Sequence, residues 1–191
     1  MYWNTPGLQL VVPGSPADAR GLMKTVALRS ENPTIFIDHQ RLQGVTGMVD
    51  DDGTGEIPLG VAEVKRDGTD VTIVAVSVMV ARALEAAERL AADGISAEVV
   101  DPRTLVPLDK DTILKSVAKT GHVVVADESQ LSCGIAAELS AIIVEEGFES
   151  LKAPIKRVGI PNVPIPFHES EEQFITPTAD KIIAAVKSIC N

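Results

Sequence analysis

Residues 70–109, DVTIVAVSVMVARALEAAERLAADGISAEVVDPRTLVPLD, decide the fold of this chain. Residues 71–76 form a continuous apolar and β-branched run, which is typical of a strand buried on both faces. Apolar side chains then recur at helical spacing over residues 80–90, Gly94 supplies a left-handed stop, and residues 97–100 resume as a strand. A strand, a helix and a strand in this order require a right-handed crossover between parallel strands, so the stretch predicts an α/β sheet.

Polar side chains mark where the predicted helices begin. A hydroxyl or carboxylate oxygen at a helix start accepts a hydrogen bond from a backbone N–H that has no partner inside the helix. The expected N-caps are Ser15, Ser77, Asp109 and Ser132, and the last helix is expected to begin near Thr178. The turn signal Asp67-Gly68 predicts a hairpin, which makes the strand within residues 57–66 antiparallel to the rest of the sheet.

Composition excludes several classes of protein. The 191 residues suffice for one domain, or for one domain and a piece of another, and the 45% apolar fraction supplies a core. A formal net charge of -10 argues against nucleic acid or an anionic membrane as a partner. The sequence has neither a run that would span a bilayer nor a signal-peptide pattern. Two cysteines, Cys133 and Cys190, are too few for a disulfide framework, and we expect a cytoplasmic protein.

The first 56 residues are less regular than the rest. Residues 8–12 and 34–37 are predicted strands around a helix that begins near residue 17, with Ala19, Leu22, Met23 and Val26 on its apolar side. Two strands and one helix cannot enclose a core alone, so they either pack on the later sheet or belong to a missing domain. Residues 43–56 are rich in Gly and Asp and predict a linker; the three aspartates at 50–52 lack the ligand spacing of a calcium loop.

Candidate chemistry gathers at the carboxyl ends of the predicted strands, where parallel sheets bind ligands. These ends carry Ser77, Asp101, Asp127 and Glu128. Asp127 and Glu128 have the composition of an acid/base pair, but we favour loop caps or solvated groups at a subunit contact.

The histidines and cysteines show no catalytic pattern. His39, His122 and His168 lack the spacing of metal ligands, and a structural role is favoured for each. Cys133 lies at a helix N-terminus, which favours a thiolate, but no base is adjacent in sequence. Gly-rich phosphate-binding motifs are absent from the sequence. The residues alone therefore predict no catalytic constellation.

Short motifs in a fixed order carry a resemblance to a known family. They are PGLQLVVP (residues 6–13), PADARGL (16–22), IPLG (57–60), DPRTLVPLD (101–109) and APIKRV (153–158). Together they cover nearly the whole chain. The chain resembles the β subunit of the thiamine-diphosphate-dependent decarboxylating component of 2-oxo acid dehydrogenase complexes. Its motifs are most similar to those of the pyruvate and acetoin dehydrogenase members.

The resemblance assigns domains and partners. Residues 1–42 correspond to the C-terminal end of a pyrimidine-binding domain, residues 43–56 to a linker, and residues 57–191 to a transketolase C-terminal domain. That domain is a three-layer α/β/α unit whose mixed sheet has one antiparallel strand, and its role is assembly. The implied partners are the α subunit, a second copy of the chain and the acyltransferase core of the complex.

Several family features are missing from the sequence. The family's activating glutamate and its His-Ser-Gln passage correspond to positions before residue 1, and the diphosphate-magnesium motif belongs to the α subunit. Asn4 stands where many relatives have histidine, and Gln43 where many have tyrosine. We therefore expect a truncated subunit that neither binds thiamine diphosphate tightly nor decarboxylates a 2-oxo acid by itself. The alternatives are a stand-alone oligomerisation module and a fragment of a transketolase or deoxyxylulose-phosphate synthase.

The resemblance also implies two binding sites. Family members bind potassium through positions that correspond to Ala27, Leu28, Ser30 and Asn32; Ser30 replaces a common aspartate, so we expect a weakened site. Family members dock to the acyltransferase core through an acid before the Ala-Pro pair and through the C-terminal carboxylate. Here those positions are Lys152 and Asn191, and the changed charge predicts weak docking.

Overall fold

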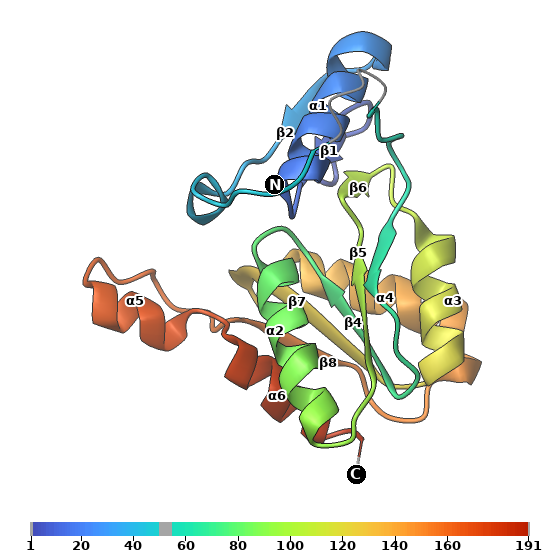
Figure 1. The fold of residues 1–191 in the computed structure, drawn as a ribbon, viewed down its shortest axis with the longest axis vertical. Coiled ribbons are helices and arrows are strands. Elements are labelled where there is room, and N and C mark those ends of the chain that lie inside the picture. The colour runs from blue at the N-terminus through green and yellow to red at the C-terminus, as the bar shows by residue number, and fades with distance from the viewer. Residues whose placement is uncertain (1, 50–54, 191) are drawn as a thin grey trace.

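The computed structural model describes residues 2–49 and 55–190. Most of the chain surrounds a five-stranded sheet with the strand order β3-β5-β4-β7-β8 (Figure 1). The strands are β3 (Glu63–Arg66), β4 (Val71–Ala75), β5 (Ala97–Asp101), β7 (Val123–Gln130) and β8 (Lys156–Ile160). β5, β4, β7 and β8 are mutually parallel, and β3 is antiparallel to β5. The predicted mixed sheet with one antiparallel strand is confirmed.

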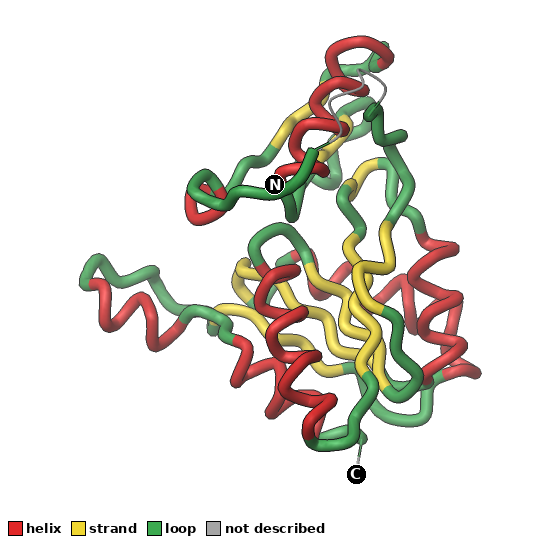
Figure 2. The backbone as a smooth tube through the Cα atoms, in the orientation of Figure 1, coloured by secondary structure: helices red, strands yellow, loops and turns green. Residues whose placement is uncertain are grey.

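Helices cover both faces of this sheet (Figure 2). α2 (Met79–Ala92) and α6 (Ala179–Lys187) pack on one face, and α3 (Lys110–Thr120) and α4 (Ile135–Gly147) on the other. Alternate residues of β4 enter the two cores, with Ile73 in the first and Val74 in the second, and both side chains are fully buried. The continuous apolar strand follows from this arrangement, since both faces are covered. The three-layer α/β/α architecture is confirmed.

The N-terminal segment lies apart from the large sheet (Figure 1). We define this segment as β1 (Gln9–Val11), α1 (Pro16–Arg29) and β2 (Thr34–Phe36). β1 pairs in parallel with β2 and antiparallel with β6 (Thr104–Val106), which gives a separate three-stranded sheet. β6 follows directly on β5 of the large sheet. The strand-helix-strand prediction is confirmed, and β6, which was not predicted, supplies the third strand.

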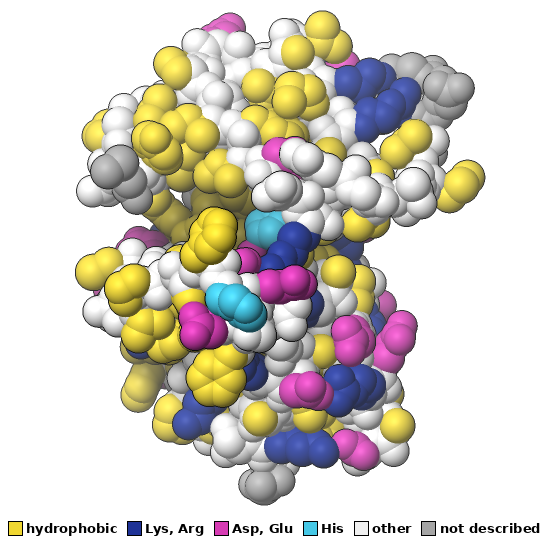
Figure 3. All heavy atoms as spheres, turned by 90° about the vertical axis from the view of Figure 1, so that its left-hand side faces the viewer, with side chains coloured by type: hydrophobic (Ala, Val, Ile, Leu, Met, Phe, Trp, Pro, Cys, Tyr) yellow, Lys and Arg dark blue, Asp and Glu magenta, His cyan; other side chains and the backbone are white. Residues whose placement is uncertain are grey.

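The remaining described elements are short. They are η1 (Gln40–Leu42), η2 (Phe148–Ser150) and α5 (Glu169–Ile175). α5 extends away from the body of the molecule (Figure 1). Phe174 in this helix and Phe167 just before it are exposed. The space-filling view shows the molecule narrowed between its upper and lower parts (Figure 3). Within the described ranges, no helix has the length and apolar character that crossing a membrane requires.

Most predicted helix ends are confirmed. Ser15 caps α1 by accepting from the N–H of Asp18 at 3.1 Å, and Asp109 caps α3 by accepting from Thr112 at 3.0 Å. Thr178 caps α6 in the same way, and Gly121 ends α3 in the left-handed conformation with φ 77. These caps depend on neighbouring residues alone, which explains why the sequence predicts them.

Two predicted caps are wrong. Ser77 has a φ of 53 and precedes α2 by two residues, so Val78 occupies the N-cap position. α4 begins after Gly134 and not after Ser132. In both places the chain leaves a strand end through a left-handed residue, Ser77 or Cys133, and this turn displaces the helix start.

The hairpin predicted at Asp67-Gly68 is also wrong, because β3 does not pair with β4. β3 pairs with β5 because both sides of β4 are occupied by β5 and β7.

The predicted apolar face of α1 is rotated as well: Leu22 is buried, but Met23 is 46% exposed. The buried side of α1 instead carries Asp18 and Thr25.

The described parts of the predicted linker, residues 43–49 and 55–56, contain neither helix nor strand, and residues 50–52 lie outside the described residues.

Candidate functional site

The carboxyl ends of the parallel strands face the N-terminal segment. Asp101 ends β5, and a β-carbon built on Gly14 would lie 2.8 Å from its Oδ2 atom. The hydroxyl of Ser77, which follows β4, donates to the carbonyl of Pro13 at 3.4 Å. Parallel sheets usually bind small molecules in this crevice. Here residues 13 and 14 of the same chain occupy it next to β4 and β5.

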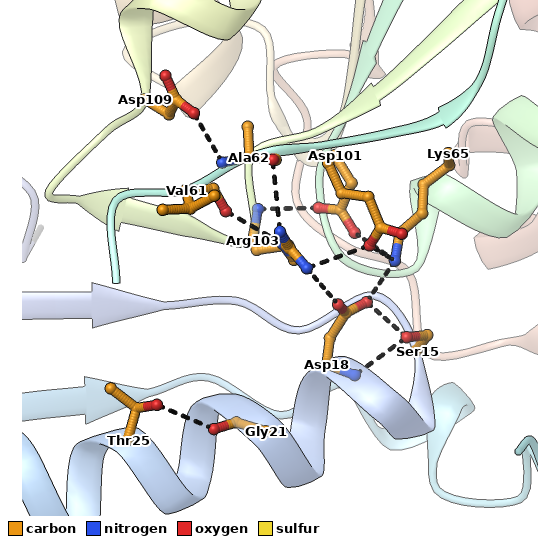
Figure 4. A network of polar contacts seen from close by, with 11 residues as sticks. Ser15, Asp18, Gly21, Thr25, Val61, Ala62, Lys65, Asp101, Arg103 and Asp109 are labelled. Carbon is orange, nitrogen blue, oxygen red and sulfur yellow. Dashed lines mark hydrogen bonds and ion pairs between the residues drawn. The ribbon is translucent and has the colours of Figure 1, made fainter. Parts of the chain in front are cut away.

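A group of charged side chains joins the two parts of the molecule, and we call it the carboxylate cluster (Figure 4). Its members are Asp18 of α1, Glu63 and Lys65 of β3, Asp101 of β5 and Arg103 of the turn after β5. Lys65 Nζ donates to Asp18 Oδ2 at 2.8 Å and to Glu63 Oε2 at 2.5 Å. Arg103 Nη1 lies 3.4 Å from Asp18 Oδ1 and 3.2 Å from Glu63 Oε2. Both cations therefore bridge the N-terminal segment and β3.

Local structure explains how the cluster is positioned. Asp18 lies in the first turn of α1, where the helix dipole favours negative charge, and the Ser15 hydroxyl donates to it at 2.5 Å. Arg103 has a φ of 58, and this left-handed turn lets its N–H donate to Asp101 Oδ1 at 2.9 Å. Its Nε also donates to the carbonyl of Val61 at 3.1 Å. The guanidinium is thus held by the carbonyl of Val61 and by the carboxylates of Asp18 and Glu63.

Burial sets the electrostatics of the cluster. Asp101 is fully buried, and its Oδ2 has no hydrogen-bond partner among the described residues. Burial, together with the negative charge of Asp18, raises the pKa of Asp101 from 3.8 to about 7, against the N–H of Arg103 and the charge of Lys65. Burial alone would lower the pKa of Lys65, but its bonds to Asp18 and Glu63 outweigh burial and raise it. The ammonium of Lys65 therefore stays charged. It lies inside the contact between the N-terminal segment and the strand ends of the large sheet, which we call the joint.

A second polar contact lies near the carboxyl end of β7, at Glu128. The Glu128 carboxylate bonds Nε2 of His39, which follows β2, and it accepts from Arg82 Nη1 at 3.0 Å. Arg82 also donates to the carbonyl of Pro177 at 2.7 Å. His39 Nδ1 accepts from the N–H of Arg41 at 3.1 Å, which assigns the proton of the neutral ring to Nε2. This contact again ties the N-terminal part to the large sheet.

The proposed acid/base pair is not assembled as a catalytic unit. Asp127 bonds the hydroxyl of Ser129, and burial raises the pKa of Asp127. Glu128 bonds His39 instead. Each carboxylate therefore bonds a different side chain.

The other histidines and Cys133 lie in separate places. His122 Nδ1 lies 3.0 Å from the carbonyl of Asp70, and His168 Nδ1 lies 2.9 Å from the hydroxyl of Ser170. Cys133 is exposed, and together with Trp3 and Asn4 it lines a hollow of about 870 Å³. Across residues 2–49 and 55–190, no three His, Cys, Asp or Glu side chains are grouped so that they could hold a metal ion.

Comparisons with known proteins identify the family. The family model described as "Transketolase, C-terminal domain" matches residues 60–182. The chain belongs to this family. It is 46% identical over 187 residues to the β subunit of acetoin:2,6-dichlorophenolindophenol oxidoreductase of Cupriavidus necator, covering 98% of this chain and 55% of that protein. It is 42% identical over 192 residues to the mitochondrial pyruvate dehydrogenase E1 component subunit beta-2 of Oryza sativa subsp. japonica, covering 99% and 51%.

Solved structures agree with this assignment. The chain superposes with a TM-score of 0.79 on a "Split gene transketolase, inactive beta4 tetramer", at 33% sequence identity, covering 98% of this chain and 58% of that one. The resemblance to β subunits of pyruvate and acetoin dehydrogenases is therefore confirmed. This transketolase C-terminal domain chain spans about half the length of the curated relatives it matches.

The residues that the resemblance implies in cation binding lie at the end of α1 and directly after it. Ser30 is the C-cap, and its hydroxyl lies 2.5 Å from Gln9 Oε1 and 2.9 Å from the carbonyl of Asn32. A hollow of about 460 Å³ is lined by Gln9, Ser30 and Asn32 among others. Ala27 and Leu28 lie in the last turn of the helix, and Leu28 is 63% exposed. Oxygen atoms of Ser30 and Asn32 thus come together with Gln9, which the sequence did not indicate.

The implied docking residue has a second role. Lys152 Nζ donates to the carbonyl of Thr120 at 3.2 Å, in the last turn of α3. Its side chain also covers Gly121, since a β-carbon there would lie 2.7 Å from Lys152 Cδ. Lys152 therefore caps the C-terminus of α3, where a cation is favourable. Asn191 lies outside the described residues.

The sequence missed four members of the carboxylate cluster, Asp18, Glu63, Lys65 and Arg103. Asp18 was visible as an acid in a capped first turn, and Arg103 as a cation directly after a buried strand ending in Asp101. Neither signal says that the two residues meet, because their contact depends on the pairing of β1 with β6.

Proposed function

We propose that this chain is the C-terminal portion of the β subunit of a decarboxylating 2-oxo acid dehydrogenase component, acting on pyruvate or acetoin, and that it serves subunit assembly. The named relatives, matched over nearly the whole chain, support this reading. In this proposal residues 1–42 are the end of a pyrimidine-binding domain, 43–56 a linker and 57–191 the transketolase C-terminal domain. A cytoplasmic location remains a prediction from the sequence.

One observation carries the assembly role. Next to β4 and β5 the crevice beyond the strand ends is occupied by the chain's own residues 13 and 14, and charged groups there pair with one another across the joint. Such a region fastens one part of the protein to another and leaves little room for a substrate. The exposed Phe167 and Phe174, by contrast, are available for contact with another subunit.

Thiamine diphosphate and magnesium belong, in this proposal, to the parent complex and not to the isolated chain. The described residues do not fit either group. The described residues contain no cluster of three acidic, His or Cys ligands, and Gly14 packs directly on Asp101 in the crevice. In this proposal the decarboxylation step requires residues outside this chain.

The α subunit and a second copy of the chain are the proposed partners. Docking to the acyltransferase core is proposed to be weak, because Lys152 places a cation where relatives are expected to carry an acid, and because its ammonium is engaged with Thr120. Titrating the chain and its Lys152→Glu variant with a cognate subunit-binding domain by calorimetry tests this. Tighter binding of the variant supports the docking surface, and equal binding of both proteins contradicts it.

A weak potassium site at Ala27, Leu28, Ser30 and Asn32 is also proposed. The support is that Ser30 and Asn32 present oxygen atoms around Gln9 at the negative end of α1. Thermal melts in potassium chloride and in sodium chloride at equal ionic strength should differ little. A large stabilisation that is specific to potassium would show that the site is strong.

Sedimentation velocity tests the assembly role. At tens of micromolar the chain should form a dimer or larger species. Addition of the α subunit of an acetoin or pyruvate dehydrogenase from the same source should give a heavier complex. A clean monomer that ignores the α subunit would overturn the proposal.

Calorimetric titration with thiamine diphosphate and magnesium, and dye-linked assays with pyruvate and acetoin, test the cofactor assignment. The isolated chain should show neither saturable binding nor turnover. Turnover in a preparation free of other subunits would contradict the proposed division of labour.

A stand-alone oligomerisation module is the second candidate. It is favoured by the superposition on the "Split gene transketolase, inactive beta4 tetramer". A fragment of a transketolase or deoxyxylulose-phosphate synthase is the third. The coding sequence upstream of residue 1 separates them. A pyrimidine domain with the family glutamate supports the dehydrogenase, a fused diphosphate motif supports the synthase, and a true start codon supports the module.

A further inference from the structure

Asp101 is sealed into the joint by the N-terminal segment. Its side chain is fully buried, Gly14 packs against Oδ2, and that oxygen has no donor within the described residues. Lys65 Nζ, the cation facing it, is 4.0 Å away and is closer to Asp18 and Glu63. A buried carboxylate oxygen without a donor is costly when it is charged. Asp101 can be hydrated only if residues 13 and 14 move away from the sheet.

The charge count of the carboxylate cluster points the same way. When every member is ionised, the three acids Asp18, Glu63 and Asp101 oppose the two cations Lys65 and Arg103, which leaves one negative charge in excess. Asp18 receives bonds from both cations, and Glu63 is 43% exposed to water. Asp101 is the acid with the fewest donors, so one proton on Asp101 neutralises the cluster.

We propose that a proton on Asp101 controls the attachment of the N-terminal segment to the large sheet: neutral Asp101 favours the closed joint, and ionised Asp101 favours release of residues 9–29 from the strand ends. This device is independent of the proposed function. It belongs to the described chain alone and requires neither a cofactor nor a partner.

The direction of the pH dependence follows from linkage. The pKa of Asp101 is about 7 in the closed joint, and a hydrated aspartate has a value near 3.8. The closed state therefore binds the proton more tightly. Its extra stability is fully present below about pH 4, falls as the pH rises toward about 7, and is constant above that value.

Other groups face the same joint and must be separated from Asp101. Asp18 lies on α1, Glu63 and Lys65 lie on β3, and Arg103 lies on the turn after β5. The turn after β4 contributes the uncharged Ser77, and α2 contributes Val80. The His39–Glu128 contact joins the same two parts of the molecule at another strand end, so His39 needs its own control.

Hydrogen exchange of the whole 191-residue chain, followed by mass spectrometry from pH 5 to 8.5, tests the proposal. Peptides from α1 report opening of the joint, and peptides from β4 and β7 report global unfolding. After correction for intrinsic exchange rates, the opening constant of α1 should rise by up to about tenfold per pH unit toward pH 7 and then level off. The Asp101→Asn variant should lose this dependence.

Two variants serve as matched controls. Asp127→Asn removes another buried acid with a raised pKa, in β7 on the far side of β4 from β5, and should keep the dependence. His39→Gln should also keep it, since the neutral amide retains a donor toward Glu128. Loss of the dependence in His39→Gln, or its survival in Asp101→Asn, would overturn the proposal.

A direct titration covers the case in which Asp101→Asn does not fold. The Asp101 carboxyl carbon of the unmodified chain is assigned through its Cβ and followed by nuclear magnetic resonance against pH. A midpoint near 7 is expected. A midpoint below about 5, close to that of an ordinary aspartate, would refute the proposal.

Discussion

Gly14 packs directly onto the carboxylate of Asp101: a β-carbon at position 14 would lie 2.8 Å from Oδ2 and 2.9 Å from a methyl group of Val80. Such distances are shorter than real contacts allow, so only glycine fits between α2 and the strand end. The N-terminal segment can approach the sheet this closely because residue 14 has no side chain.

Gly14→Ala should therefore loosen the joint. The new methyl group must displace Asp101 or the backbone, and overpacking of this kind costs about 1–3 kcal/mol. We expect a lower Tm by scanning calorimetry and faster hydrogen exchange in α1. Gly44→Ala is the matched control, because a β-carbon there meets nothing within 4 Å, and its Tm should change little. Equal Tm values for the two variants would contradict this account of Gly14.

Asp18→Ala should be severely destabilising. Asp18 is 1% exposed, and its loss removes the buried carboxylate that Lys65 and Arg103 share, which leaves both cations with only the partly exposed Glu63 as a shared partner. Removal of one partner of a buried ion pair costs about 3–5 kcal/mol. Urea unfolding provides the measurement. Asp93→Ala, which removes the exposed partner of Lys187, should cost under about 1 kcal/mol, and a similar loss in both variants would argue against a special role for Asp18.

Asp109→Ala should shorten α3 and release the chain before β3. Asp109 accepts from Thr112 as the N-cap and from the N–H of Ala62 at 2.9 Å. Although burial acts to raise the pKa of Asp109, these bonds outweigh burial and lower it. We expect a loss of about 1–2 kcal/mol near neutral pH.

The pH dependence of this loss has the sign opposite to that of Asp101. Because the folded pKa of Asp109 is lowered, its stabilisation is present above the unfolded value of about 4 and is lost as the pH falls through the folded value. The difference in unfolding free energy between the two proteins should therefore shrink in acid. Asp111→Ala, in the same helical turn but exposed, should cost less at every pH.

Lys152→Glu should destabilise α3 even without any partner. It removes the bond to the Thr120 carbonyl and places a negative charge at the negative end of the helix. Lys152→Met loses the bond but keeps an apolar stem over Gly121, so its Tm should lie between those of the parent and the glutamate variant. If Lys152→Glu melts like the parent chain, the ammonium does not cap the helix.

The large sheet was predictable because its signals are local. The buried run of β4, the cap at Asp109 and the left-handed Gly121 each depend on a few neighbouring residues. β6 was not predictable in this way, since three residues after Arg103 become a strand only by pairing with β1. The raised pKa of Asp101 likewise depends on Asp18, which no periodicity relates to β5. Ser77 fails as a cap because the turn after β4 is shaped by packing against residue 13.

The position of β1 between β2 and β6 has a consequence for folding during synthesis. Leu10 pairs with Val106, so β1 gains its second neighbour only after the ribosome has produced the first half of the large sheet. Until then the apolar residues 10–12 lack their final partner, and loop closure over so many residues is slow. Within this chain, β1 is therefore synthesised before β6 but gains β6 as a neighbour only late.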